Sequence, residues 1–123
     1  MSFINQLFDS VSKTIHSNLD VRLRRHNLIS ANIVNADTPN YVPVDMDFRD
    51  TLEAVAQGRS GTEVPTPAVF YDPTQVPGPD GNAVDIDFEM TRLTLNQQTY
   101  QSSTVALNKR LGLLRYAIME GRG

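Results

Sequence analysis

The chain of 123 residues contains no cysteine, and its 11 Lys and Arg are outnumbered by 14 Asp and Glu. Without cysteine it can form no disulfide framework, no thiolate nucleophile and no cysteine-ligated zinc or iron–sulfur site. A formal net charge of −3 argues against nucleic acid as a partner, because phosphate binding requires a clustered positive excess. The length supports a single domain, residues 1–123.

Long apolar runs are also absent. No stretch approaches the roughly 18 uncharged apolar residues of a membrane-spanning helix, so we expect no membrane insertion. The first residues lack both a basic start and an apolar core, so no cleavable signal peptide is visible. If the protein leaves the cytoplasm, it uses a different route.

Sequence motifs of known catalytic, cofactor-binding and metal-binding sites are missing as well. The sequence has no phosphate-binding loop, no dinucleotide-binding glycine pattern and no Ser/His/Asp order. On one helix His16 and His26 would lie about 80° and about 15 Å apart, too far to share a metal ion. The sequence therefore predicts no catalytic residue, no metal site and no cofactor, and a protein that is not an enzyme.

Proline defines the organisation of the chain, because all seven prolines lie within residues 39–83. We predict a mostly α, elongated fold with an N-terminal helix in 1–36 and a C-terminal helix in 84–123. An irregular Pro/Gly-rich connector over 37–83 joins them. A helix over 3–34 would be about 48 Å long, more than the diameter of about 35 Å expected for a compact chain of this length.

The C-terminal segment has the clearest periodicity. From Ile86 to Ile118, steps of four and three residues meet ten positions, of which eight are apolar. This spacing is typical of a coiled-coil-like helix pair, with the partner either antiparallel in the same chain or in another subunit. The seam residues that we expect at the interface are Leu93, Tyr100, Leu107, Leu111, Leu114 and Ile118.

The N-terminal helix carries a wider apolar stripe, which indicates more than one packing partner. Between the helices we expect at most a short strand within 63–71 and one or two helical turns within 47–57. Two similar strings, Val-Asp-Met-Asp-Phe at 44–48 and Val-Asp-Ile-Asp-Phe at 84–88, bracket the loop region. The basic residues Arg22, Arg24, Arg25 and His26 form either a solvated helix face or a contact with acidic pairs of another subunit, such as Asp45/Asp47 or Asp85/Asp87.

Residues 30–41 end the first helix. Asn32 and Asn35 can hydrogen-bond to nearby backbone, Pro39 stops the helix, and Asn40 suits a turn with positive φ. The string Ala-Asn-Ile-x-Asn-Ala-x-Thr-Pro-x-Tyr over 31–41 resembles the N-terminal signature of bacterial flagellar basal-body rod and hook proteins. That family usually has Gly where this chain has Asn40.

Within the family, the short length, the Asp-Met-Asp-Phe string and the C-terminal ending resemble the B-type proximal-rod protein. The resemblance implies a structural subunit of the rod, in the periplasmic part of the basal body, exported unfolded by the flagellar type III apparatus and folding on helical assembly. It implies as partners other copies of the chain, other rod proteins and the adaptor to the membrane ring. It also implies a subunit interface at Ala31, Asn32, Ile33, Asn35, Ala36, Thr38, Pro39 and Tyr41.

Phe3 and Leu7 are similar to the apolar pattern proposed for export-gate recognition in related substrates. Three alternatives stay open from the sequence. One is a soluble coiled-coil adaptor or chaperone that works as a dimer. The second is an enzyme with a site in the 57–83 loop, where the ionisable side chains are few. The third is a different proximal-rod type of the same family, the C type.

Overall fold

The computed structural model describes residues 2–59 and 64–121. The elements follow in the order α1 (Ser2–Val34), β1 (Val44–Asp47), α2 (Arg49–Ala56), β2 (Ala68–Tyr71) and α3 (Ile86–Glu120). Residues 1, 60–63 and 122–123 of the predicted segments lie outside the described residues.

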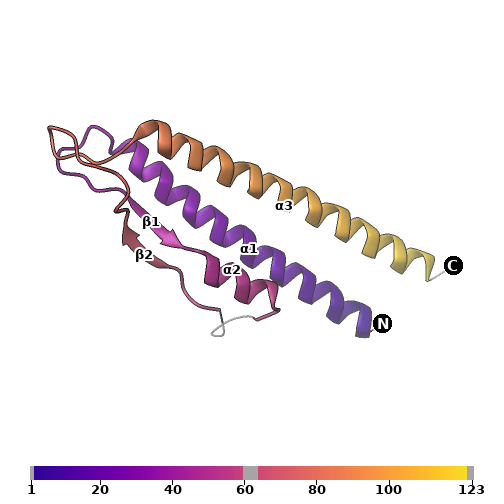
Figure 1. The fold of residues 1–123 in the computed structure, drawn as a ribbon. Helices are drawn as coiled ribbons and strands as arrows, with labels where there is room; N and C mark the ends of the chain where they lie inside the picture. The colour runs from indigo at the N-terminus through magenta and orange to yellow at the C-terminus, as the bar shows by residue number, and fades with distance from the viewer. Residues whose placement is uncertain (1, 60–63, 122–123) are drawn as a thin grey trace.

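The two long helices run antiparallel and side by side, so that both chain ends lie at one end of the molecule (Figure 1). With 33 and 35 residues, α1 and α3 are each about 50 Å long. The predicted mostly helical, elongated fold with two long terminal helices is therefore confirmed. Of the two arrangements left open by the sequence, the structure has the antiparallel one within a single chain.

Local sequence signals explain where the helices begin and end. The Asp85 side chain caps α3 by accepting a hydrogen bond from the Phe88 backbone N–H at 3.2 Å. Gly121 follows the last turn. After α1, Asn40 has φ 61°, as expected from its place in the turn. Gly81 faces it with φ 77° and leaves no room for a side chain beside Asn40.

The connector is more ordered than predicted. β1 and β2 pair antiparallel, from Val44 opposite Tyr71 to Asp47 opposite Ala68, and α2 lies between them in the sequence. The expectation of an irregular 37–83 segment is wrong for these elements. The short strand and helical turns expected within it are present, but β1 was missed, because four residues are too few to show a period and its partner is over 20 residues away.

α1 forms the middle layer of the molecule. α3 packs along one side of it, and β1 and α2 pack along another (Figure 1). This agrees with the wide apolar stripe of α1. The fully buried apolar residues lie mainly where α1 meets the connector, namely Val21, Ile29, Met46, Ala54 and Val55.

The six seam residues of α3, from Leu93 to Ile118, are half-buried, and the residues between them are largely exposed. The predicted seam is wrong before Leu93, because Ile86 and Met90 are about half exposed, and again at Gln97, which is exposed. Glu89 and Asn96, both nearly fully buried, face inward instead. This part of α3 packs through polar groups, which an apolar periodicity does not reveal.

A matched pair of substitutions tests this orientation of α3. We expect Leu111→Asp to lower the free energy of unfolding by about 1–3 kcal/mol, because it places a carboxylate on the face packed against α1. Leu113→Asp is the control, since Leu113 is 69% exposed. Urea unfolding followed by circular dichroism measures both. An equal loss of unfolding free energy in the two variants would show that α3 is rotated relative to the structure described.

Candidate functional site

The signature residues 31–41 lie at the end of the molecule where α1 leads into the connector. Asn32 is fully buried, Ile33, Asn35, Ala36 and Tyr41 are half-buried, and Ala31, Thr38 and Pro39 are exposed. The signature thus divides into residues that hold this chain together and residues that face outward.

The Asn32 side chain holds β1. Its amide nitrogen donates to the Val44 carbonyl at 2.8 Å, and its oxygen accepts from the Val44 N–H at 3.0 Å. The same oxygen accepts from the Tyr41 hydroxyl at 3.0 Å. Asn32 therefore supplies the hydrogen-bond partners that a neighbouring strand would give to the outer edge of β1. We call Asn32, Tyr41 and Val44 the signature clamp.

Asn82 joins the end of α1 to the segment before α3. Its amide nitrogen donates to the carbonyls of Asn35 at 2.9 Å and Thr38 at 2.6 Å, and its oxygen accepts from the Val84 N–H at 2.8 Å. No sequence pattern predicts this role of Asn82. The available signal was its position directly after the Asp80-Gly81 turn, but nothing local points to a partner 47 residues away.

Five buried charges connect α1, α3 and the connector, and we call them the ion network. Arg92 of α3 contacts Asp45 of β1, Asp72 after β2 at 3.2 Å and Glu89 at 3.4 Å. Arg25 of α1 donates to both carboxylate oxygens of Asp45, at 3.3 and 3.4 Å. Each of these side chains is at most 15% exposed. Charges so deeply buried require oppositely charged partners, and here the arginines and the carboxylates are partners of one another.

Gln75 completes the ion network. It donates to Asp72 at 3.0 Å and to Glu89 at 2.7 Å, and its oxygen accepts from the Asp85 N–H. The segment after β2 is thereby fixed to the start of α3. One oxygen of Glu89 has no hydrogen-bond partner among the described residues.

Burial governs the electrostatics of this region. It lowers the pKa of Arg25, an effect that the nearby Glu89 charge opposes, and it lowers the pKa of Arg92, as does the Arg25 charge. Both guanidiniums stay cationic, since arginine is not deprotonated in proteins. Burial also raises the pKa of Tyr41, and the Glu89 charge acts in the same direction. The phenol therefore stays protonated and keeps its hydrogen bond to Asn32.

Two of the basic residues of α1 pair with carboxylates of the same chain. Arg25 pairs with Asp45 of its own chain, and exposed Arg24 pairs with Asp20 one turn earlier at 3.1 Å. Arg22 and Arg25 both lie over the Phe48 ring, at 5.2 and 4.3 Å from its centre. Arg92 lies similarly over Phe88, so both Val-Asp-x-Asp-Phe strings end in a ring that stacks on arginine.

The remaining predicted positions lie away from the ion network. Phe3 is 74% and Leu7 is 42% exposed near the start of α1.

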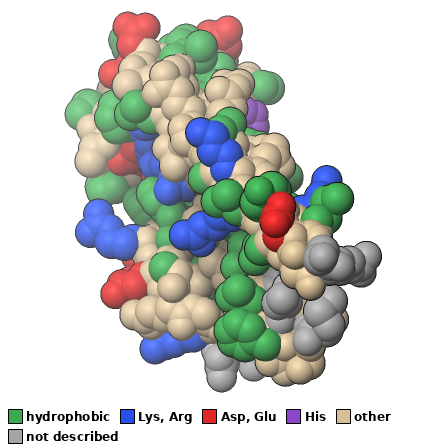
Figure 2. Space-filling view, turned by 90° about the vertical axis from the view of Figure 1, so that its right-hand side faces the viewer, with side chains coloured by type: hydrophobic (Ala, Val, Ile, Leu, Met, Phe, Trp, Pro, Cys, Tyr) green, Lys and Arg blue, Asp and Glu red, His purple; other side chains and the backbone are tan. Residues whose placement is uncertain are grey.

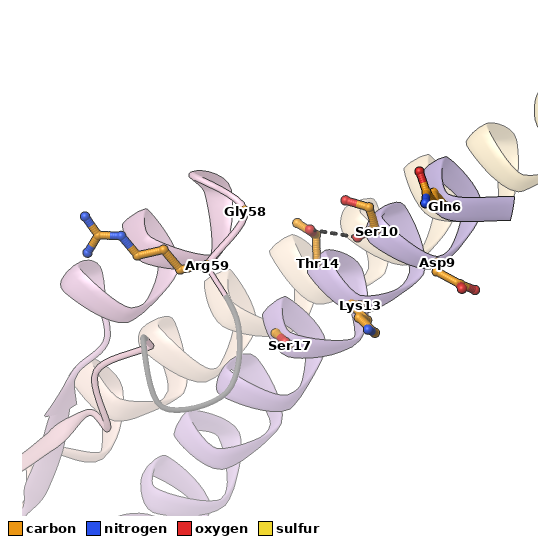
Figure 3. Close-up of a pocket in the computed structure, with 8 residues that line it drawn as sticks. All are labelled: Gln6, Asp9, Ser10, Lys13, Thr14, Ser17, Gly58 and Arg59. Atoms are coloured by element: carbon orange, nitrogen blue, oxygen red, sulfur yellow. Dashed lines mark hydrogen bonds between the residues drawn. The ribbon is translucent and has the colours of Figure 1, made fainter. Parts of the chain in front are cut away.

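The hollow in Figure 3, beside the polar face of α1, presents no converging groups, because Lys13 and Arg59 point away from each other. Within residues 2–59 and 64–121, no cluster of three or more metal-ligating acids or histidines occurs. No helix in those ranges has the length and hydropathy to cross a bilayer.

A long antiparallel helix pair, fixed by polar contacts that serve packing, defines a fold of the helical-hairpin class. No model of a protein family matches the chain. It is 34% identical over 122 residues to the flagellar basal body rod protein FlgB of Escherichia coli K12, covering 84% of this chain and 88% of that protein. It is 35% identical over 112 residues to FlgB of Salmonella typhimurium, covering 76% and 81%.

A similar relationship links the chain to FlgB of Cereibacter sphaeroides, with 34% identity over 112 residues, 81% of this chain and 87% of that protein. The chain therefore belongs to the FlgB family of flagellar basal body rod proteins. It is a structural subunit of the proximal rod and not an enzyme. Among the sequence-based alternatives, this assignment favours the B-type rod protein over a soluble adaptor.

The signature clamp predicts the effect of removing Asn32. We expect Asn32→Ala to lower the free energy of unfolding by about 2–4 kcal/mol, because the Val44 N–H and C=O and the Tyr41 hydroxyl lose their partner. Urea unfolding measures the loss. Asn108→Ala, at an exposed position of α3, is the control and should change stability little. A loss as small as that of the control would contradict the clamp.

The ion network predicts how stability depends on pH. Burial alone would raise the pKa of Asp72, but hydrogen bonds from the Thr74 hydroxyl, the Gln75 amide and the Thr74 N–H outweigh it and lower the pKa. A lowered folded-state pKa contributes stability above the unfolded value, about 3.9, that is lost as pH falls through the folded value. Asp72→Asn should therefore be less stable than the native chain at neutral pH.

That difference should narrow as the pH falls below about 4, because the native chain then loses the same contribution. Unfolding free energies measured in urea over this acid range test the sign. Asp47→Asn, which removes an exposed carboxylate of β1, is the control. A constant difference between Asp72→Asn and the native chain would show that Asp72 stabilises the fold by packing and not by charge.

Proposed function

We propose that this rod subunit is exported unfolded by the flagellar type III apparatus and completes its folding on helical assembly in the periplasmic rod. Its partners are then further copies of the chain, other rod proteins and the adaptor to the membrane ring. The observation that carries this proposal is the second apolar face of α3, which no other described part of the chain covers.

That outer face lies opposite the seam. Leu95, Val105, Leu113 and Tyr116 are all 54–69% exposed, and Ser102 and Ala106 make a shallow hollow between them. Large apolar side chains exposed along a whole helix are typical of an interface between chains. In the assembled rod, neighbouring helices bury this face, and the coiled-coil-like pairing of α1 with α3 continues into contacts between subunits.

The small core supports folding coupled to assembly. Among the side chains that the structure describes, few large apolar ones are fully buried, and the C-terminal half of α3 is covered on one side alone. Burial on this scale offsets little of the conformational entropy that a 35-residue helix loses on ordering. A neighbouring subunit supplies the missing burial, and a chain that is marginally stable beforehand is also easily exported unfolded.

Within this function the signature residues serve two purposes. Asn32, Asn35 and Tyr41 shape the end of α1 from inside the chain. Ala31, Ile33, Ala36, Thr38 and Pro39 form the outward part of the subunit interface, and the partly exposed seam residues of α3 contribute its rim. Phe3 and Leu7, exposed on α1, are available to the export gate before assembly.

Complementation of a deletion strain tests the proposal. Cells without the gene should build no hook or filament, and the native gene should restore both. Leu113→Asp should be exported yet fail to restore swimming, because it charges the uncovered face of α3 without touching α1. Swimming assays, electron microscopy of basal bodies and detection of the exported chain measure these outcomes. Normal swimming with Leu113→Asp would show that this face is not an assembly surface.

A further inference from the structure

Charge is segregated along the molecule. No Lys or Arg occurs between Arg25 and Arg49, or between Arg59 and Arg92. The end of the molecule where α1 stops and α3 starts therefore exposes carboxylates, while Arg25 and Arg92 are held by the carboxylates of the ion network. We call this the acidic end, and its exposed carboxylates are Asp37, Asp80, Asp85 and Asp87.

The opposite end, which holds both chain termini, is basic. Within residues 2–19 and 103–121, four cations face two carboxylates, Asp9 and Glu120. We call this the basic end, and its cations are Lys13, Lys109, Arg110 and Arg115, all exposed. Asp87 and Arg115 are 28 residues apart on one helix, or about 42 Å, so the two ends of a single chain cannot meet.

Both ends of α3 also expose large apolar side chains. At the acidic end, Ile86, Phe88 and Met90 are 42–50% exposed. At the basic end, three further large side chains are 65–69% exposed, namely Leu113, Tyr116 and Met119. Figure 2 views the molecule toward its chain termini and shows hydrophobic side chains among Lys and Arg.

We propose that the acidic end of α3 in one subunit docks on the basic end of α3 in a second copy. This inference rests on the proposed function and names the surfaces through which copies meet. Opposite charge selects the partner and its direction, while the apolar side chains supply the buried area. Because the two surfaces differ, the contact is heterologous and leaves a free end of each kind on the growing assembly.

Oxidative cross-linking tests the contact cleanly, since the chain has no native cysteine. Met90 and Tyr116 are exposed at opposite ends of α3. A mixture of the single variants Met90→Cys and Tyr116→Cys should give the mixed dimer in excess over either homodimer. The double variant Met90→Cys/Tyr116→Cys should give a ladder of trimers and longer chains.

The double variant separates open from closed association. Two antiparallel copies would also bring unlike ends together, but they would form two cross-links and stop at the dimer. A ladder supports the proposal. A product that stops at the dimer overturns it, and so does the absence of mixed dimers from the single variants.

Charge reversal tests the basis of the contact. In the double-cysteine background, Lys109→Glu/Arg110→Glu/Arg115→Glu should slow ladder formation at least about tenfold at low ionic strength, as expected for loss of electrostatic steering. Asp37→Lys/Asp87→Lys should slow it similarly, and mixing the two reversed proteins should restore cross-linking. Arg49→Glu, an exposed charge reversal on α2, is the matched control and should leave the rate unchanged.

Salt provides an independent check. Raising the ionic strength from about 0.01 M to about 1 M shortens the Debye length from about 30 Å to about 3 Å and should suppress the ladder of the native-charge protein several-fold. Insensitivity to both salt and charge reversal would overturn the assignment. Failure of the rod function itself would appear separately, as normal flagella in the deletion strain, whatever the cross-links show.

Discussion

The position of Arg92 is the constraint on which the rest of the structure depends. Its guanidinium contacts carboxylates from β1, from the segment after β2 and from its own helix. Gln75, Asn82 and the two short strands join the same parts of the chain. Because a planar guanidinium donates in several fixed directions at once, one side chain sets how α3 meets the whole connector.

A buried network of this kind contributes more to specificity than to stability. Removing two guanidiniums and three carboxylates from water costs about as much as their mutual attraction returns. An apolar patch at the same place would allow α3 to rotate or slide on α1. The ion pairs allow one register, and the fully buried Glu89 and Asn96 at inward positions of α3 agree with that role.

The sequence predicts those features of the fold that depend on neighbouring residues alone. Proline placement and periodicity are sufficient for the two long helices, and turn preferences are sufficient for Asn40. Polar contacts across the chain follow no such rule. Arg92 is 20 residues from Asp72 and 47 from Asp45, and Asn82 is 47 from Asn35. Nothing in an isolated sequence pairs these residues, so the basic stretch of α1 could be interpreted as a contact with another subunit.

Asn32 belongs to the family signature and also has a clear physical role in this fold. Its side chain satisfies both polar groups of Val44 on the edge of β1 that β2 leaves open. An aspartate could not donate there, and a leucine could neither donate nor accept. The signature therefore fixes the shape of one end of the hairpin from within. We propose that the subunit meets its neighbours through the outward residues of the signature and through the uncovered face of α3.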